Sequence, residues 1–478
     1  MRRSLDKLPH LPVASMDCDT DDLAGPMLAA FSAGTDNPEA FLQWCQAHQV
    51  AGILTEMLLP TSMPQTLVRD ALHTACVIER KRLGRPDTRL LTIGVLGSAG
   101  KTTTALLIAK LLRDLGLSVA YETDLGHGWG CTQKTSTQKT SSRPQANGPG
   151  LFRRLDHAAN QACQIAVIEI PEDQAGCGAL ATLQWDMLVV TGPASAPKTF
   201  GPHPLDTALE RLAPDGVVII PNDPKLSSAI DTDVATIAYG FGAADVSIGV
   251  AEESGGLATL LLTRQNETAV LETALTGSRN AMNHAAAACV GTLLSAPLHQ
   301  IAESLGGLRQ LPGRDQRMTD GQSAPIILDV AGDATRAARL IRDYRDQSDV
   351  ENVWVVAAID SGDADLQMLG TQLERHAANI VLTSTPDGDG EFLAAAHAVV
   401  DGTRHAAAQR WVASPCDAIA WAYRQASLRD VVIVIAGQRQ RTAAGQRKTL
   451  QMWEKLITAA MQGTTKGNQR AALKVFRG

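Results

Sequence analysis

Residues 91 to 112, LTIGVLGSAGKTTTALLIAKLL, place an apolar run, a glycine-containing loop and an amphipathic helix in immediate succession. The apolar run has the length of a buried strand, and the apolar residues after Lys101 recur at helical spacing. Glycines and a lysine at such a junction let backbone N–H groups and an ammonium face a phosphate. The stretch therefore predicts a strand–loop–helix unit of an α/β fold, with a phosphate site in its loop.

The loop is a shortened relative of the Walker A pattern G-x-x-x-x-G-K-T, because a strict count places the first glycine where Val95 stands. In this pattern the lysine neutralises the β- and γ-phosphates and the next hydroxyl ligates Mg²⁺, so the predicted cofactors are ATP and Mg²⁺. An ordinary glycine-rich turn is the alternative, but Lys-Thr at a helix start adds nothing to packing. The predicted cofactor-binding residues of the loop are Gly97, Ser98, Ala99, Gly100, Lys101, Thr102 and Thr103.

The rest of the chain continues the alternation of strands and helices. SVAYET, QIAVIEI, DMLVVTG and GVVIIPND are strand-like and are separated by helical patterns, as in a parallel sheet covered on both faces. A second series, PIILDVAG, ENVWVVAAID, ANIVLTST and DVVIVIAGQ, begins near residue 311. The sequence therefore predicts an α/β protein with domains at 1–88, 89–310 and 311–455 and a basic tail at 456–478. The helical pattern LDTALERLA and a long polar loop at 125–150, either a binding loop or disordered, lie in the central part.

Composition excludes several classes of protein. The formal charge of -7 gives no global attraction to nucleic acid or to an anionic membrane. The eight cysteines contain no C-x-x-C pair, which argues against structural zinc and a disulfide framework and favours a reducing compartment. The N-terminal stretch lacks the apolar core of a secretory signal, and no window approaches a membrane-spanning length. We therefore expect a soluble, cytoplasmic protein with no nucleic-acid or membrane partner.

Six segments resemble one enzyme family in the order in which that family has them. GVLGSAGKTTT resembles the GvtGTNGKTTt loop of the Mur ligases, which use ATP to add amino acids to UDP-N-acetylmuramoyl precursors, and IAVIEI is similar to their aVmEvS. GSRNAMNHAAAA is similar to GxhNvxNalAA, LPGRDQRM to vpGRmE, and IILDVAGDATRAARLI to vivDYAHtPdal. The segment from DCDTDD to VAGIL resembles the uridine-binding segment of the tripeptide synthetases. The resemblance spans residues ~17 to ~445 and implies a three-domain Mur-ligase-like architecture with a central P-loop sheet and a Rossmann-like C-terminal domain.

The resemblance also implies roles for single residues. Lys101 and Glu169 would be catalytic, with Thr102 and Glu169 holding the Mg²⁺ that orients the γ-phosphate of ATP. An exposed acid at a strand end is the alternative for Glu169. Asn280 and Asn283, three residues apart on one helix, would contact adenine, although Asn is also a common helix cap.

Arg314 and Asp329 would reach the nucleotide from the third domain, so that catalysis would depend on domain closure.

The chain also departs from the family in several motifs. TGPASAPKTFGPH stands where the family has TNlsxDHLDyHG, so Ala196 and Pro197 replace an Asp-His pair, and Lys198 is expected to supply part of the lost charge unless it is a bystander. LDTALERLA lacks the lysine that the family carbamylates, and Gly332 stands in place of the histidine of DYAHtP. AAIDSGDADLQ replaces GxGGDRDxxKR, STPDG replaces DNPR, and the Arg of DSR is absent around 19–21. Phosphate binding is retained in this comparison, while the second metal support and the substrate pockets are rewritten.

Two function classes follow. The first is a divergent ATP-dependent carboxylate–amine ligase, ADP-forming and acting through an acyl phosphate, with a small-molecule or peptide carboxylate and an amino acid as substrates. The second is an ATP-binding pseudo-ligase that serves as a scaffold or regulator of a protein partner. A ParA-like ATPase would need a second lysine where Leu96 stands. The sequence does not identify the substrate, the amino acid or the oligomeric state.

Overall fold

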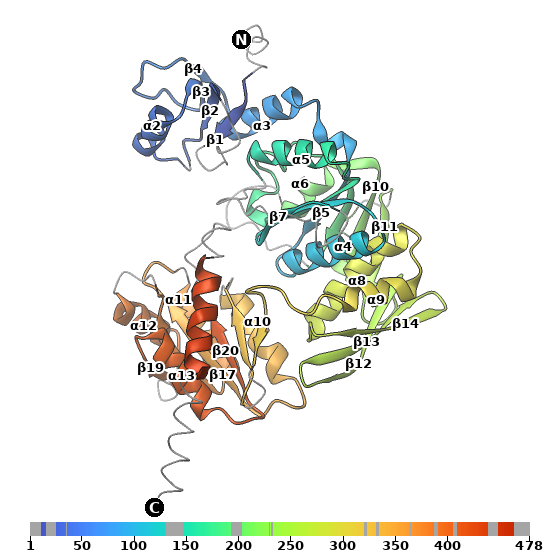
Figure 1. Cartoon of the computed structure of the whole chain (residues 1–478), viewed down its shortest axis with the longest axis vertical. Helices are drawn as coiled ribbons and strands as arrows, with labels where there is room; N and C mark the ends of the chain where they lie inside the picture. Colours follow the sequence, from blue (N-terminus) through green and yellow to red (C-terminus); the bar gives the residue numbers. More distant parts are fainter. Residues whose placement is uncertain are drawn as a thin grey trace, which may run out of the picture. The chain divides into compact units, whose positions relative to one another are not determined.

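The computed structural model describes residues 11–15, 25–34, 36–130, 147–192, 203–228, 230, 233–319, 323–330, 334–363, 365–386, 391–404, 409–437 and 448–462. Its strands form three sheets of four, ten and six strands, and each sheet carries helices of its own (Figure 1). This confirms the predicted α/β class. No helix in these ranges is both long and apolar enough to cross a membrane.

The chain divides into two compact units, and the division crosses the strands at the edge of the second sheet. The first unit comprises Met1–Gly249, Leu261–Leu271 and Asn280–Leu305. The second comprises Val250–Leu260, Glu272–Arg279 and Gly306–Gly478. The domain boundaries predicted near residues 88 and 310 stay a prediction, which limited proteolysis at 85–90 and 305–312 would test.

The first sheet is parallel and lies between two helices. Asn37 caps the first of these, since its side chain accepts hydrogen bonds from the backbone N–H groups of Glu39 and Ala40. Phe31 and Phe41 pack edge to face in the core on that side. In spatial order the strands are β1 (Val13–Ser15), β2 (Met27–Phe31), β3 (Val50–Thr55) and β4 (Gln65–Leu67), and the helices are α2 (Pro38–Ala47) and α3 (Ala71–Arg82).

Helix α3 ties this sheet to the next part of the chain. Its Cys76 belongs to the same buried core as Phe152. Its Glu79 is fully buried, accepts hydrogen bonds from Arg82 and Arg153, and also accepts one from the Val13 N–H. Because a buried carboxylate needs such partners, this cluster fixes the first sheet against the central helix that carries Arg153.

The second sheet has the order β14-β13-β12-β11-β10-β9-β5-β8-β6-β7. Its strands are β5 (Leu91–Leu96), β6 (Val119–Thr123), β7 (Gly126–Gly128), β8 (Ile165–Ile170), β9 (Trp185–Val190), β10 (Leu212–Pro221), β11 (Ala235–Gly240), β12 (Val246–Ser254), β13 (Leu257–Arg264) and β14 (Glu267–Thr273). Strand β5 pairs in parallel with β8 and β9, so the loop after β5 lies where the carboxyl ends of three strands meet. That edge is the usual ligand position in a parallel sheet.

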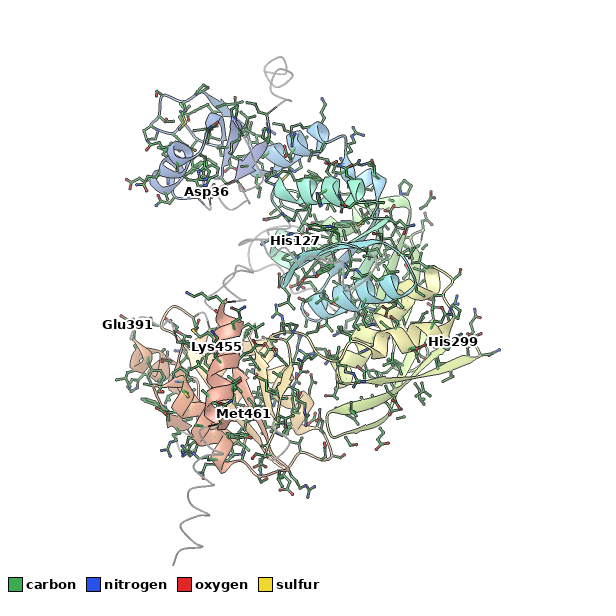
Figure 2. The ribbon with its side chains drawn as sticks, in the orientation of Figure 1. Asp36, His127, His299, Glu391, Lys455 and Met461 are labelled. Carbon is green, nitrogen blue, oxygen red and sulfur yellow. The ribbon has the colours of Figure 1, made fainter. Side chains whose placement is uncertain are left out.

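Within the described residues, eight helical segments belong to this part of the chain, among them the short η2 (Glu172–Gln174) after β8. The others are η1 (Pro86–Arg89), α4 (Lys101–Asp114), α5 (Gly150–Asn160), α6 (Pro204–Leu209), α7 (Pro224–Ser227), α8 (Ser278–Leu293) and α9 (Leu298–Gly306). Helix α6 is shorter than the predicted LDTALERLA helix, because Leu212 already begins strand β10. Strand β7, which carries His127 (Figure 2), lies inside the predicted 125–150 loop and pairs with β6, and residues 131–146 are outside the described ranges.

The third sheet is parallel except for β15, as a doubly wound Rossmann-like sheet requires. Its spatial order is β15 (Gln316–Met318), β16 (Ile326–Asp329), β20 (Val431–Ile435), β17 (Val353–Ile359), β18 (Asn379–Ser384) and β19 (Gln409–Trp411). One face is covered by α10 (Ala334–Arg345), α11 (Leu366–His376) and α12 (Phe392–Asp401), and the other by α13 (Pro415–Gln425) and a helix at 448–462.

The last helix corrects the predicted start of the basic tail. Trp453 and Ile457 are buried in the core of the third sheet, and Lys455 and Met461 lie on the same helix (Figure 2). Residues 456–462 therefore belong to the folded domain because their apolar face is covered. The rest of the tail, 463–478, lies outside the described residues.

Candidate functional site

The loop between β5 and α4 has a backbone that only glycine can supply at two points. Gly97 has φ 143° and Gly100 has φ 82°, both in the region that favours glycine. A Cβ at Gly97 would lie 2.5 Å from the Thr191 Oγ1, and one at Gly100 would lie 2.3 Å from the Asn283 Oδ1. The two predicted glycines are thus required by their conformation and by the close approach of Thr191 and Asn283.

Lys101 begins helix α4 and folds back over the loop. Its Nζ donates a hydrogen bond to the Gly97 carbonyl oxygen at 2.8 Å. The residue before it, Gly100, gives the helix no side-chain cap. The first N–H groups of α4 therefore point toward the loop with the positive end of the helix dipole, which favours an anion there.

Thr102 and Glu169 form the buried polar contact of the site. The Thr102 Oγ1 lies 2.9 and 3.1 Å from the two carboxylate oxygens of Glu169, and both residues are less than one-tenth exposed. Glu169 stands on β8 beside β5, and it also accepts a hydrogen bond from the Asp124 N–H at 3.1 Å. The alternative of an exposed strand-end acid is therefore wrong for Glu169.

This donor set fits Mg²⁺. Among the residues that the structure describes, no group of three or more His, Cys, Asp or Glu side chains could hold a metal by itself. Mg²⁺ bound through one carboxylate and one hydroxyl takes its other ligands from phosphates and water, which is the usual arrangement at nucleotide sites. Thr102 and Glu169 are the residues that would hold it.

The remaining predicted loop residues, Ser98, Ala99 and Thr103, are half-buried around this contact. The Ala99 carbonyl accepts a hydrogen bond from the Thr191 hydroxyl at 2.6 Å. Thr191 directly follows β9 and is not among the site residues predicted from the sequence, although the first residue of TGPASAPK matches the first residue of the family pattern TNlsxDH.

Asn280 and Asn283 lie together on α8 at the loop. Both are buried, the Asn283 Nδ2 donates to the Asn280 Oδ1 at 3.3 Å, and the Asn283 Oδ1 lies against Gly100. Helix α8 begins at Ser278, so Asn283 is inside the helix and the cap alternative does not describe it. The next residue, His284, is fully buried, and desolvation lowers its pKa to about 4, so this side chain is neutral and adds no charge.

Arg314 and Asp329 belong to the second unit, and both are buried there. Asp329 ends strand β16, and its Oδ2 accepts a hydrogen bond from Arg336 at 3.0 Å. Their contact with a nucleotide stays a prediction.

Several residues of the altered motifs lie outside the described ranges. They are those at 19–21, Ala196, Pro197, Lys198 and Gly332, together with the end of STPDG. The expected compensating role of Lys198 therefore stays a prediction.

Comparisons with known proteins found similar sequences and solved structures among the Mur ligases. No family model matches the chain. The sequence is 25% identical over 389 residues to the UDP-N-acetylmuramoyl-L-alanyl-D-glutamate–2,6-diaminopimelate ligase of Geobacillus kaustophilus (strain HTA426), covering 75% of this chain and 77% of that one.

Solved structures show the same fold over nearly the whole chain. The MurF of Acinetobacter baumannii aligns with a TM-score of 0.64 at 18% identity, covering 92% of each chain. The MurF ligase of Thermotoga maritima, solved in complex with ADP, aligns with a TM-score of 0.62 at 16% identity, covering 94% of this chain and 99% of that one. Its three sheets have the three-domain architecture of the Mur ligases, and at about 25% identity the chain is a distant homologue of these enzymes.

Proposed function

We propose that this protein is an ATP-dependent carboxylate–amine ligase that forms an amide bond through an acyl phosphate and releases ADP. The observation that carries the proposal is the buried Thr102–Glu169 contact beside a glycine loop that ends in Lys101. A hydroxyl, a carboxylate and an ammonium at one helix N-terminus are the groups that a Mg²⁺-bound triphosphate needs. The ligases found as relatives support the same reaction class.

The residues of the loop would act in a defined order. The N–H groups at the start of α4 bind the phosphates, and the Lys101 ammonium exchanges the Gly97 carbonyl for a phosphate oxygen. Mg²⁺ held by Thr102 and Glu169 would neutralise the β- and γ-phosphates. The substrate carboxylate then attacks the γ-phosphorus, ADP leaves, and an amine displaces phosphate from the acyl carbon. Lys101 stabilises the charge that develops on the transferred phosphoryl group.

Four other residues would complete the nucleotide site. Asn280 and Asn283, at the loop, would bind the adenine through amide donors and acceptors. Arg314 and Asp329 would join them when the domains close over the nucleotide. The second substrate would be an amino acid, and the first a small molecule or peptide with a free carboxylate.

A pseudo-ligase that binds ATP and regulates a protein partner is the second candidate. It is favoured by helix α6, which has the sequence PLDTAL and offers no lysine for a carbamate. It is also favoured by Asp360, whose carboxylate is occupied by the Gly362 N–H and the Thr385 hydroxyl.

The deciding experiment is ADP release with a panel of amino acids and UDP-muramoyl or peptide acceptors. We expect acceptor-dependent ADP from the parent protein, none from Glu169→Ala, and a reduced rate from Lys198→Ala. Tight ATP binding with no turnover for any acceptor would replace the ligase by the pseudo-ligase. Turnover that survives in Glu169→Ala would remove Glu169 from the mechanism.

A further inference from the structure

We propose that Thr191 is a positioning residue of the nucleotide site, whose hydroxyl holds one peptide plane of the phosphate loop in its binding orientation. The proposal rests on the proposed function, because it concerns the same loop. Thr191 touches no reacting group and acts only through the loop backbone.

Three contacts join Thr191 to the loop and to the strand before it. Its N–H donates to the Leu96 carbonyl at 2.7 Å, which extends the pairing of β9 with β5 by one residue. Its Oγ1 lies 2.6 Å from the Ala99 carbonyl oxygen and 3.2 Å from the Leu96 carbonyl oxygen. Because a hydroxyl has one proton, the shorter contact is the hydrogen bond that it makes.

The bond to Ala99 determines where the next N–H points. In a planar trans peptide the C=O and the following N–H point in opposite directions. A carbonyl of Ala99 held toward Thr191 therefore directs the N–H of Gly100 away from β9. Gly100 immediately precedes Lys101, so this N–H is one of the donors that would meet a phosphate.

Gly97 and Thr191 are coupled sterically. The Thr191 Oγ1 occupies the position that a side chain at Gly97 would need, 2.5 Å from an ideal Cβ. The glycine therefore serves to admit the hydroxyl as well as to turn the backbone. This explains how the loop keeps its shape although its glycines alone would leave it free to adopt others.

A matched control lies on the neighbouring strand. The Thr92 hydroxyl donates to a backbone carbonyl, that of Gln184, at the same distance of 2.6 Å. Thr92 is near the amino end of β5 and Thr191 is at the carboxyl end of β9, where the loop lies. Thr92→Val and Thr191→Val thus each remove a hydroxyl-to-carbonyl bond, at opposite ends of one strand pair. Thr92→Val also removes the contacts of that hydroxyl with the Asp186 carboxylate at 3.0 Å and the Asp186 N–H at 3.2 Å.

The experiment measures the affinity of the full-length protein for Mg-ATP, Mg-ADP and adenosine, together with the midpoint of thermal unfolding. We expect Thr191→Val to weaken Mg-ATP and Mg-ADP by about tenfold, the effect of one hydrogen bond, with adenosine affinity unchanged. Thr191→Ser, which keeps the hydroxyl, should stay within about threefold of the parent. Thr92→Val should lower the unfolding midpoint and leave all three affinities in place.

A loss that extends equally to adenosine, or that Thr191→Ser shares, would show a general structural role and overturn the proposal. Thr191→Ala serves as a second variant if the valine methyl beside Gly97 prevents folding. Lys101→Ala separates this proposal from the proposed function. If Lys101→Ala keeps full Mg-ATP affinity, the loop is not the nucleotide site and both fail. If it loses affinity while Thr191→Val and Thr191→Ala do not, only the positioning role fails.

Discussion

The polar residues at the carboxyl ends of the strands differ between the second and third sheets. In one sheet they could bind a ligand, and in the other they bind groups of their own loops. Beside the strand ends of the second sheet lie Lys101 and Thr102, at the start of α4, and Glu169, near the end of β8. They bind one another or the loop backbone through contacts that a phosphate and a metal could replace. In the third, Asp360 lies at the end of β17 and binds the Gly362 N–H at 3.3 Å and the Thr385 hydroxyl at 3.1 Å.

These contacts of Asp360 in the third sheet are made within the protein's own loops. The Asp363 Oδ2 accepts a hydrogen bond from the Asp360 N–H at 2.8 Å, and a Cβ at Gly437 would lie 2.8 Å from the Thr385 methyl group. The family pattern GxGGDRDxxKR has basic residues in this segment, and this chain has AAIDSGDADLQ. Under the proposed function, the nucleotide-binding end would be kept, while the end of the third sheet carries groups that stabilise its own loops.

The largest expected effect is at the nucleotide end. Lys101→Ala should weaken Mg-ATP binding by about a hundredfold or more, because it removes the ammonium that faces the phosphates. Lys110→Ala is the matched control, since Lys110 lies on the same helix but pairs with Asp114. Isothermal calorimetry on both variants measures the difference. If Lys101→Ala and Lys110→Ala bind Mg-ATP with equal affinity, the loop before α4 is not the nucleotide site.

Glu169→Gln should have the next largest effect, and it should be specific for the metal. The amide keeps the shape but loses the charge that favours Mg²⁺, so we expect the Mg²⁺ concentration for half-maximal ATP binding to rise by about tenfold. ATP affinity in EDTA should not change. A titration of Mg²⁺ at fixed ATP measures the shift, and an unchanged Mg²⁺ dependence would remove Glu169 from the metal site.

The proposed nucleotide site could be inferred from the sequence because its signals are local. The loop, the Lys-Thr pair and the start of α4 occupy a few consecutive residues, and their order alone indicates a phosphate site. The contacts that hold the loop are not local, since Thr191 bonds Ala99 across 92 positions and Thr102 bonds Glu169 across 67. Only the resemblance pointed to Glu169 and Asn283, and nothing local to the motif pointed to Thr191.

The same limit applies to the fold. The central parallel strands of the second and third sheets were predicted from short apolar runs, whereas the parallel strand β11 and the strands β12, β13 and β14 were missed. Two-residue connections join these three strands, so they pair as hairpins, and only alternate residues of β14 are buried. Residues 456–462 were assigned to a tail because the stretch beyond residue 455 is basic as a whole. These seven residues, LITAAMQ, contain no basic side chain, and Trp453 and Ile457 anchor their helix in the core.

Asp360→Ala tests whether Asp360 stabilises the loops at the strand ends of the third sheet. Removing the carboxylate leaves the Gly362 N–H and the Thr385 hydroxyl without this acceptor, so we expect the free energy of unfolding to fall by about 1.5 kcal/mol. Mg-ATP affinity should stay as in the parent. Chemical denaturation and calorimetry measure the two quantities. Unchanged stability, with a raised KM for an acceptor, would make Asp360 a ligand-binding group and break the comparison.

The smallest expected effect concerns acid stability in the second unit. Desolvation raises the pKa of Asp343 to about 6 despite the Arg279 guanidinium 3.7 Å away, and Asp315 and Glu253 nearby add negative charge. The folded state then holds more protons than the unfolded state between about pH 4 and pH 6, so stability falls as the pH rises through this window. Asp343→Asn should raise the free energy of unfolding at pH 7 by about 1 kcal/mol and lose that advantage near pH 4. Urea unfolding at the two pH values measures it, and an equal change at both would contradict the assignment.

The bond between the Lys101 ammonium and the Gly97 carbonyl has a kinetic consequence. The loop has a defined backbone, and its lysine is held by a partner that a phosphate oxygen could replace without any change in that backbone. If this loop binds the nucleotide, capture would need no slow rearrangement of the loop, and its rate would be that of diffusional encounter with a preformed site. Variants that remove contacts from this loop should therefore bind nucleotide as fast as the parent and release it sooner, so that residence time is the quantity by which they differ.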